Sequence, residues 1–159
     1  MAHEGPRWLD DHEQVAWRSY LQMQARLEAA IGRQLQADSD LSAADFAVLV
    51  SLTDRSDGRA RVLELARALD WEKSRLSHHL ARMHRRGLIC RDGCDEDKRG
   101  SYVAVTDAGR AAVEAAAPAH VATVRRLVFD ILSADDVAAL ASISQRVLAQ
   151  IETSSLCDE

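Results

Sequence analysis

The sequence predicts a mainly α-helical fold that carries one small β-hairpin. The 159-residue chain is rich in alanine and leucine and holds seven glycines and two prolines, a composition that favours helices. Apolar residues recur at helical spacing over most of its length. Two short β-type runs, LICRDG and SYVAVT, replace that spacing on either side of the polar turn CDEDKRG, which is the pattern of a hairpin. The length fits a single domain.

Each helix is predicted from its apolar periodicity and its ends. The expected helices cover roughly residues 10–37, 42–55, 61–69, 73–86, 107–131 and 133–152. Ser42 with Asp45, and Ser133 with Asp136, have the three-residue spacing of capping boxes at helix starts. Gly87 is a typical residue to end the fourth helix.

Bulk composition excludes several classes of protein. With 47% hydrophobic residues the chain can bury a core, so global disorder is not expected. No apolar run approaches the roughly 20 residues that a membrane span needs, and the amino terminus lacks the apolar segment of a secretory signal. Three cysteines form no paired framework, which suits a reducing compartment. We therefore expect a cytoplasmic protein that does not enter a membrane.

Positive charge is concentrated in the middle of an acidic chain. The whole sequence has a formal net charge of −5, whereas residues 1–58, 59–91 and 92–159 carry −5, +6 and −6. A solvated basic face would be the plainest explanation. A swing of this size within so short a segment instead favours a surface that binds a polyanion.

The helix expected at 73–86 separates apolar from basic residues. Leu76, Leu80 and Met83 fall on one side of the helical wheel, with His79 at its boundary. The opposite side and its flanks carry Ser74, Arg75, Ser77, His78, Ala81, Arg82 and Arg85. Arginine, small polar groups and alanine suit the major groove of DNA. A helix, a tight turn, this helix and a hairpin together predict a winged helix-turn-helix.

The same segment resembles a known family. The stretch LELARALDWEKSRLSHHLARMHRRGLICR, followed by DEDKRGSYVAVTDAGR, is similar to the multiple antibiotic resistance regulator (MarR) family over roughly residues 42–115. The most specific part is the wing signature Asp97-Lys98-Arg99, followed after a strand by residues 106–109. The resemblance implies that Asp97 supports the wing and that Arg99 carries a basic side chain to the minor groove.

The resemblance also implies how the chain is organised. We expect one domain over residues 1–159, in which residues 42–106 bind DNA and residues 8–37 and 107–153 form helices that make a homodimer. It implies a repressor that small aromatic or phenolic anions release from DNA. The expected partner is double-stranded DNA with a pseudo-palindromic operator. The residues predicted to contact it are Lys73, Ser74, Arg75, Ser77, His78, Arg82 and Arg85 in the helix and Lys98 and Arg99 in the wing.

Aromatic residues at the start of the first helix are candidates for an effector site. Trp17 and Tyr20 are three residues apart and share a helix face, with His12 and Arg18 nearby. An aromatic wall beside a cation could hold a planar anion. Packing of Trp17 and Tyr20 in the dimer core explains the same pattern and is the interpretation we favour at this point.

Other functions have weaker support in the sequence. No cofactor or metal is expected, because the histidines and cysteines lack the usual ligand spacing, although a zinc-responsive member of this fold stays open. Cys94, close to Arg91, could carry an acidified thiol, so a redox-responsive regulator is a second alternative. No enzyme motif is present. A helical interaction module with an acidic protein partner is the remaining alternative.

Overall fold

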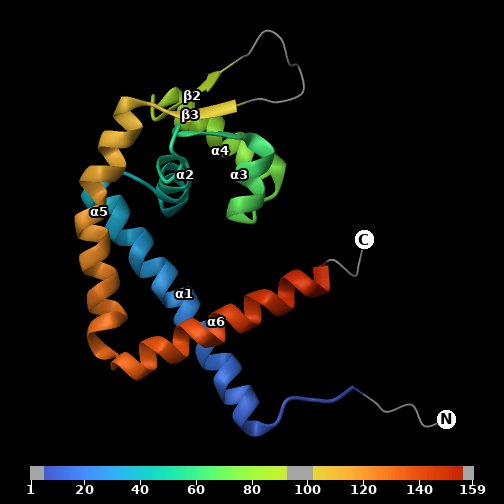
Figure 1. The fold of residues 1–159 in the computed structure, drawn as a ribbon. Coiled ribbons are helices and arrows are strands. Elements are labelled where there is room, and N and C mark those ends of the chain that lie inside the picture. Colours follow the sequence, from blue (N-terminus) through green and yellow to red (C-terminus); the bar gives the residue numbers. More distant parts are fainter. Residues whose placement is uncertain (1–5, 93–101, 156–159) are drawn as a thin grey trace, which may run out of the picture. The chain divides into compact units, whose positions relative to one another are not determined.

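The computed structural model describes residues 6–92 and 102–155 (Figure 1). In chain order its elements are α1 (Asp11–Ser39), α2 (Ala43–Thr53), β1 (Arg59–Arg61), α3 (Val62–Leu69), α4 (Lys73–Arg85), β2 (Ile89–Asp92), β3 (Tyr102–Val105), α5 (Asp107–Leu127), the short 3-10 helix η1 (Phe129–Ile131) and α6 (Ala134–Ser155). These residues divide into two compact units, one ending at His120 and the other beginning at Val121. None of the helices in the described ranges is long and apolar enough to cross a membrane.

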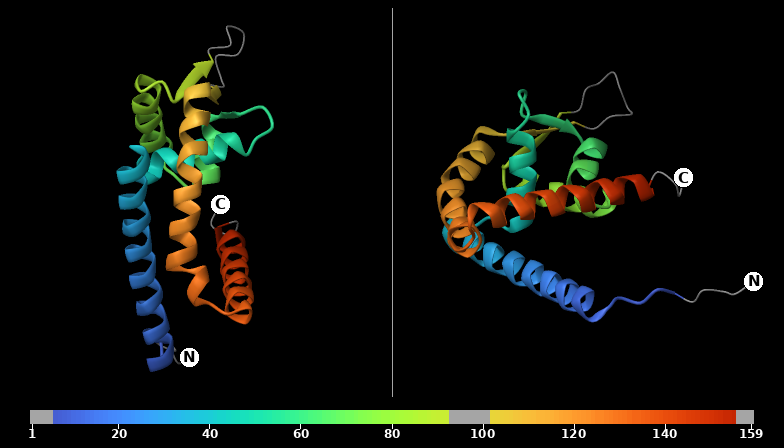
Figure 2. Two further views of the ribbon diagram at one scale, coloured as in Figure 1. Left: turned by 90° about the vertical axis from the view of Figure 1, so that its left-hand side faces the viewer. Right: turned by 60° about the horizontal axis from the view of Figure 1, so that its bottom comes forward.

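The core of the first unit lies where α2, α3 and α4 meet the sheet. Figures 1 and 2 show these three helices gathered beside the strands, with α1 extending away from them. The largest fully buried side chains are Leu35, Leu41, Val48, Leu49, Leu52, Leu65, Leu76, Leu80, Met83, Ile89 and Val103. From α1, only Leu35 is buried. The amino-terminal part of α1 therefore leaves its apolar side chains exposed in the single chain.

The predicted hairpin is present and forms part of a larger sheet. β2 and β3 pair antiparallel, with Ile89 opposite Val105. β1, which the sequence did not predict, pairs with the other edge of β3, so that Arg59 lies opposite Ala104 and the strand order is β1-β3-β2. Three residues are too few to show the alternating pattern of a strand, so β1 can be identified only from its pairing with β3.

The helix ends agree with their capping signals. Ser42 and Asp45 exchange backbone-to-side-chain hydrogen bonds of 3.0 Å at the start of α2. Ser133 and Asp136 exchange the same kinds of bond before α6, at 3.0 and 3.2 Å. Two predicted boundaries were wrong: the fifth helix ends at Leu127 before η1, and the sixth continues to Ser155.

The end of α4 is joined directly to the start of α5. Gly87, with φ of +75°, lets its own N–H bond the His84 carbonyl while the N–H of Leu88 bonds that of Met83, a Schellman ending. The Thr106 hydroxyl donates to the Gly87 carbonyl at 2.6 Å and accepts from the Gly109 N–H at 3.0 Å.

Gly109 brings the backbones of this joint together. A Cβ atom at Gly109 would lie 2.0 Å from the carbonyl oxygen of Leu88, so no other residue fits without displacing one of the two backbones. Thr106 and Gly109 of the wing signature therefore have a structural role. They hold the first turn of α5 against the segment that ends α4.

One buried carboxylate connects α2 to the end of α4. Asp45 Oδ2 accepts hydrogen bonds from the Arg86 guanidinium at 2.6 Å and from the Ser42 N–H at 3.0 Å. Asp45 Oδ1 lies 3.0 Å from His79 Nε2, a close polar contact that is not aligned as a hydrogen bond. Arg86 also donates to the carbonyl oxygen of Asp40 at 2.8 Å. The Asp45 side chain, only 4% exposed, thus organises residues from both helices and the loop before α2.

These contacts determine which groups are charged. Burial opposes ionisation of Asp45, but hydrogen bonds from Arg86 and Ser42 outweigh it and lower the pKa of this carboxyl. Burial lowers the pKa of His79, and repulsion from Arg82 adds to this effect, although attraction to Asp45 opposes it. At neutral pH, Asp45 is therefore a carboxylate and His79 a neutral imidazole.

We expect Asp45→Asn to lower the free energy of unfolding by about 2 kcal/mol at pH 7, because it weakens hydrogen bonds to a charged group. The lowered pKa gives the pH dependence. The carboxylate's contribution is fully present above its unfolded pKa of about 3.9 and is lost as the pH falls through the lower folded value. Urea unfolding between pH 7 and about 3 should show the difference between wild type and variant shrinking at the acid end.

Asp54→Asn is the matched control, since Asp54 is an exposed carboxylate at the end of the same helix. It should change the free energy of unfolding by less than about 0.5 kcal/mol at every pH. An Asp45→Asn effect that is equally small, or that does not vary with pH, would show that the buried carboxylate is not the connection described above.

Candidate nucleic-acid interface

α4 has one buried face and one exposed face, as the sequence predicted. Leu76, Leu80 and Met83 are fully buried and His79 is 6% exposed. The side open to solvent carries Lys73, Ser74, Arg75, His78, Ala81, Arg82 and Arg85. Ser77 is half-buried at the edge. The helix therefore presents cations and small side chains outward, as a helix that enters the major groove does.

Two of the exposed arginines are held by neighbouring rings. Arg82 Nη2 donates a hydrogen bond to His79 Nδ1 at 2.9 Å. The Arg75 guanidinium lies 4.8 Å from the centre of the Trp71 ring, a cation–π contact. Trp71 in turn meets the His79 ring edge-on at 5.7 Å between centroids. These contacts restrict the rotamers of both arginines while leaving most of their N–H groups available.

A basic groove of about 500 Å³ lies between α4 and β2. It is lined by His78, Ala81, Arg82, His84, Arg85 and Arg91. Arg91 reaches from β2 toward α4, where its Nη2 donates to the carbonyl oxygen of Ser77 at 3.3 Å. The sequence placed Arg91 in the basic segment but not among the site residues, since a single arginine in a strand has no spacing signal. Its three arginines give the groove the positive charge that attracts a phosphate backbone.

A second pair of arginines lies on the sheet. The guanidiniums of Arg59 and Arg61 lie 4.6 and 5.2 Å from the centre of the Tyr102 ring, and Arg61 Nε donates to the Tyr102 hydroxyl at 3.0 Å. Sequence reasoning missed these residues because it missed β1. The predicted wing residues Asp97, Lys98 and Arg99 lie outside the described residues.

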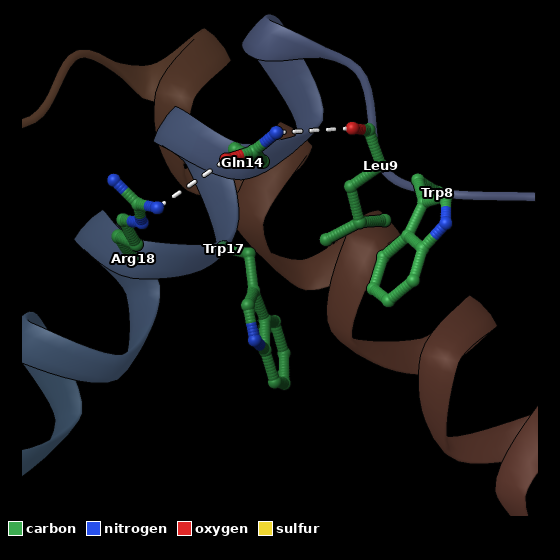
Figure 3. Close-up of a pocket in the computed structure, with 5 residues that line it drawn as sticks. All are labelled: Trp8, Leu9, Gln14, Trp17 and Arg18. Carbon is green, nitrogen blue, oxygen red and sulfur yellow. Dashed lines mark hydrogen bonds between the residues drawn. The ribbon is translucent and has the colours of Figure 1, made fainter.

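The predicted effector residues are only partly brought together. A shallow hollow of about 290 Å³ at the start of α1 is lined by Trp8, Leu9, Gln14, Trp17 and Arg18 (Figure 3). His12 and Tyr20 are not part of its lining.

The aromatic and cationic parts of this hollow do not converge. Arg18 donates to the side chain of Gln14 at 3.3 Å, and Figure 3 shows it directed toward that residue rather than toward the Trp17 indole. Trp17 instead stacks on Tyr20, with 5.8 Å between ring centroids and 23° between planes. Both rings are about half exposed, Trp17 at 52% and Tyr20 at 47%.

The residues considered for metal binding or redox chemistry lie partly within the described ranges. Within residues 6–92 and 102–155, no three His, Cys, Asp or Glu side chains gather as metal ligands do. Cys90 is half-buried in β2 with its Sγ 3.7 Å from the Ala104 carbonyl oxygen. Cys94 and Cys157 lie outside the described residues.

Comparison with known proteins agrees with this geometry. Residues 41–109 match the family described as a winged helix DNA-binding domain. That span begins just before α2 and ends in the first turn of α5, so it contains α4 and the whole sheet. No curated protein shows a significant similarity to the chain.

Solved structures resemble nearly the whole chain. AbsC, a MarR family transcriptional regulator from Streptomyces coelicolor, is 34% identical with a TM-score of 0.87, over 93% of this chain and 99% of that one. Sco3205, a MarR family transcriptional regulator from the same organism solved in complex with DNA, is 38% identical with a TM-score of 0.86, over 93% and 92%. A mutant MarR from E. coli complexed with operator DNA is 25% identical with a TM-score of 0.75, over 88% and 99%.

The first two similarities extend far beyond α4 and the sheet. They include the long helices on either side of the winged helix, for which the sequence carried no specific motif. With its winged helix DNA-binding domain and with full-length relatives above 30% identity, the chain belongs to the MarR family of transcriptional regulators.

Proposed function

We propose that this regulator is a homodimeric repressor that inserts α4 into the major groove of a pseudo-palindromic operator. The observation that carries the proposal is the exposed face of α4, where arginines, serines and an alanine stand opposite a fully buried apolar face. The relatives Sco3205 and E. coli MarR were solved with DNA, the latter with operator DNA, which supports a similar partner here.

Reading and holding of DNA fall to different residues. Arg82 and Arg85 have guanidiniums that can pair with guanine, and Ala81, on the same face, allows close approach. Lys73 and Ser74, in the first turn of α4, are placed to hold phosphates. A dimer should recognise half-sites separated by about one helical turn, ~10 bp.

Arg91 extends the proposed interface beyond α4. It lines the same groove as Arg82 and Arg85, so a phosphate strand leaving the major groove would pass three guanidiniums. The bond from Arg91 to the Ser77 carbonyl holds it beside the reading helix.

Exposed apolar side chains support the homodimer. Leu140, Ile143, Val147, Leu148 and Ile151 of α6 are between 39% and 58% exposed, and Val15, Trp17, Tyr20, Leu21 and Met23 of α1 are similarly open. Ile31, further along α1, packs against the core of the winged helix and is not part of this exposed set. Apolar surface on this scale is unfavourable in water, and burial against a second copy removes it.

The proposal also includes release from DNA by a small aromatic or phenolic anion. Trp17 lines the hollow at the start of α1, but the cation beside it is bonded to Gln14. Stacking of Trp17 on Tyr20 within an exposed apolar stripe equally fits a dimer contact. A ligand releases DNA only if it binds the DNA-incompetent form better than the competent one.

The main alternative is an interaction module whose basic face binds an acidic protein. Electrophoretic shift of genomic DNA fragments over a salt series separates the two. A DNA reader keeps a subset of fragments at salt concentrations that release the rest, whereas an acidic-partner module shows no such subset. A redox- or zinc-responsive regulator would show the same DNA selectivity but lose it on oxidation or on addition of zinc.

We expect Arg82→Ala to weaken specific binding by about 1–3 kcal/mol and to relax base preference, because a bidentate pair with guanine is lost. Lys98→Ala should weaken binding to all sequences alike and lower the salt slope by about one unit, as loss of a phosphate contact does. Quantitative shift assays with selected and scrambled duplexes measure both. Arg125→Ala, an exposed arginine of α5 that pairs with Asp130, is the control and should change neither quantity.

If Arg82→Ala keeps both the specific affinity and the base preference, then Arg82 of α4 does not read bases in the way proposed. If Arg125→Ala weakens binding as much as Arg82→Ala, general loss of positive charge explains the effect and base reading does not.

We expect Val147→Glu to prevent dimer formation, since it places a charge within the exposed apolar stripe of α6. Ser142→Glu adds the same charge on the opposite, polar side of that helix and should leave the dimer intact. Sedimentation velocity gives the oligomeric state of each. Removal of residues 133–159 should likewise give monomers or aggregates that fail to shift operator DNA. A tightly DNA-binding truncation would count against the assigned interface.

We expect Trp17→Ala to separate the two interpretations of the aromatic pair. If Trp17 binds effector, the variant keeps its dimer and its DNA affinity but is no longer released by aromatic carboxylates or phenols. If Trp17 packs between subunits, the variant weakens the dimer. Sedimentation and shift assays on the same sample, with and without salicylate as the probe, distinguish these outcomes.

A further inference from the structure

A continuous chain of polar contacts leads from the interior to the reading face. It begins at Arg86, which bonds Asp45 Oδ2 at 2.6 Å, and passes from Asp45 Oδ1 to His79 Nε2 at 3.0 Å. It ends where His79 Nδ1 meets Arg82 Nη2 at 2.9 Å. Asp45 and His79 are buried, whereas Arg82 is exposed beside the basic groove.

The direction of each proton along this chain follows from the chemistry of the donors. A guanidinium only donates, so Nδ1 of His79 accepts the bond from Arg82 and carries no proton. A neutral imidazole then holds its proton on Nε2, which faces the Asp45 carboxylate. Asp45 therefore favours the one tautomer of His79 that can accept from Arg82.

Resting on the proposed function, we infer that His79 is a positioning residue for DNA reading: it holds the Arg82 guanidinium in place beside the groove, and Asp45 keeps His79 in the accepting form. A free arginine loses the freedom of several torsions when it pairs with a base. In the free protein, the hydrogen bond from Arg82 Nη2 to His79 Nδ1 already restricts the Arg82 side chain. Much of the conformational entropy is therefore lost before DNA binds, and the other N–H groups of the guanidinium remain available to DNA.

Protonation of His79 reverses the arrangement. Imidazolium carries a proton on both nitrogens, so Nδ1 becomes a donor and repels Arg82. The charged groups that face His79 are Asp45 from α2 and, from α4 itself, Arg82 and Arg75, while Trp71 in the turn before α4 presents its ring edge-on. Asp45 would keep its contact with the imidazolium, so the change falls on Arg82.

The test compares two substitutions at His79 in the full-length protein. His79→Asn keeps an acceptor near the position of Nδ1, whereas His79→Leu fills similar space with no acceptor. The quantity measured is the ratio of affinities for the tightest duplex selected from a random-sequence pool and for a scrambled duplex. We expect His79→Leu to lower this ratio roughly 3- to 10-fold, as for re-ordering one long side chain, and His79→Asn to change it less than about twofold.

The stability of the variants separates positioning from a packing role. Asn is the poorer replacement in a buried site, so thermal unfolding should rank His79→Asn at or below His79→Leu. A residue that only supports the core would lower DNA discrimination in that same order. The inference requires the opposite order, with the less stable Asn variant discriminating better.

A double-mutant cycle locates the effect. In an Arg82→Ala background, His79→Leu should cause no further loss of discrimination. If it does, or if His79→Leu leaves the ratio of the otherwise wild-type protein unchanged while Arg82→Ala lowers it, His79 does not act through Arg82. The proposed function then stands without the inference. If Arg82→Ala itself preserves base preference, the reading role of Arg82 fails and the inference fails with it.

A pH series gives a second, independent readout. Discrimination by the wild type should fall at acid pH, because protonation of His79 removes the acceptor for Arg82. The pKa of His79 is lowered, so the fall should begin below about 6.5, the ordinary pKa of histidine. His79→Asn should lack this fall. His78 and His84 line the same groove and are present in both proteins, so the comparison of wild type with His79→Asn isolates the contribution of His79. A parallel fall in wild type and His79→Asn would overturn the proposed role.

Discussion

The packing of α2 against α4 depends on one buried charge, the Asp45 carboxylate. A carboxylate that leaves water is unfavourable unless donors surround it. Asp45 accepts hydrogen bonds from the Ser42 N–H and the Arg86 guanidinium and has a close polar contact with His79 Nε2. Because these groups belong to the start of α2 and to α4, the need to satisfy the carboxylate fixes how the two helices lie against each other. The same side chain thus caps one helix and orients another.

The acidic character of the rest of the chain makes the basic face more effective. The segments before residue 59 and after residue 91 carry net negative charge, whereas the segment from residue 59 to residue 91 carries net positive charge and attracts a DNA duplex. A molecule of this kind approaches DNA in a restricted range of orientations. The cation–π contact of Arg75 with Trp71 and the bond of Arg82 to His79 add order at the scale of single side chains.

Local patterns predicted what local physics determines. The sequence predicted the capping box of Ser42 and Asp45, the buried stripe of α4 and the ending at Gly87, because each depends on residues within one or two turns of a helix. The contacts of Asp45 with His79 and Arg86 were not, because their partners lie 34 and 41 positions away and no spacing rule joins them.

Strand β1 escaped for the same reason. Its three residues become a strand only by pairing with β3, more than 40 positions later. The contacts of Arg59 and Arg61 with the Tyr102 ring were therefore not predicted either. At the start of α1, the sequence correctly placed Trp17 beside Tyr20. It did not predict that Arg18 would bond Gln14, because an exposed arginine chooses among several neighbours.

The joint between α4 and α5 has a mechanical consequence. Thr106 bridges the last carbonyl of one segment and the first turn of the other, and Gly109 lies against Leu88 with no room for a methyl group. These contacts make the junction between the two segments rigid. A rotation of the first turn of α5 would therefore turn the end of α4 with it, because two hydrogen bonds and one backbone contact connect the two segments.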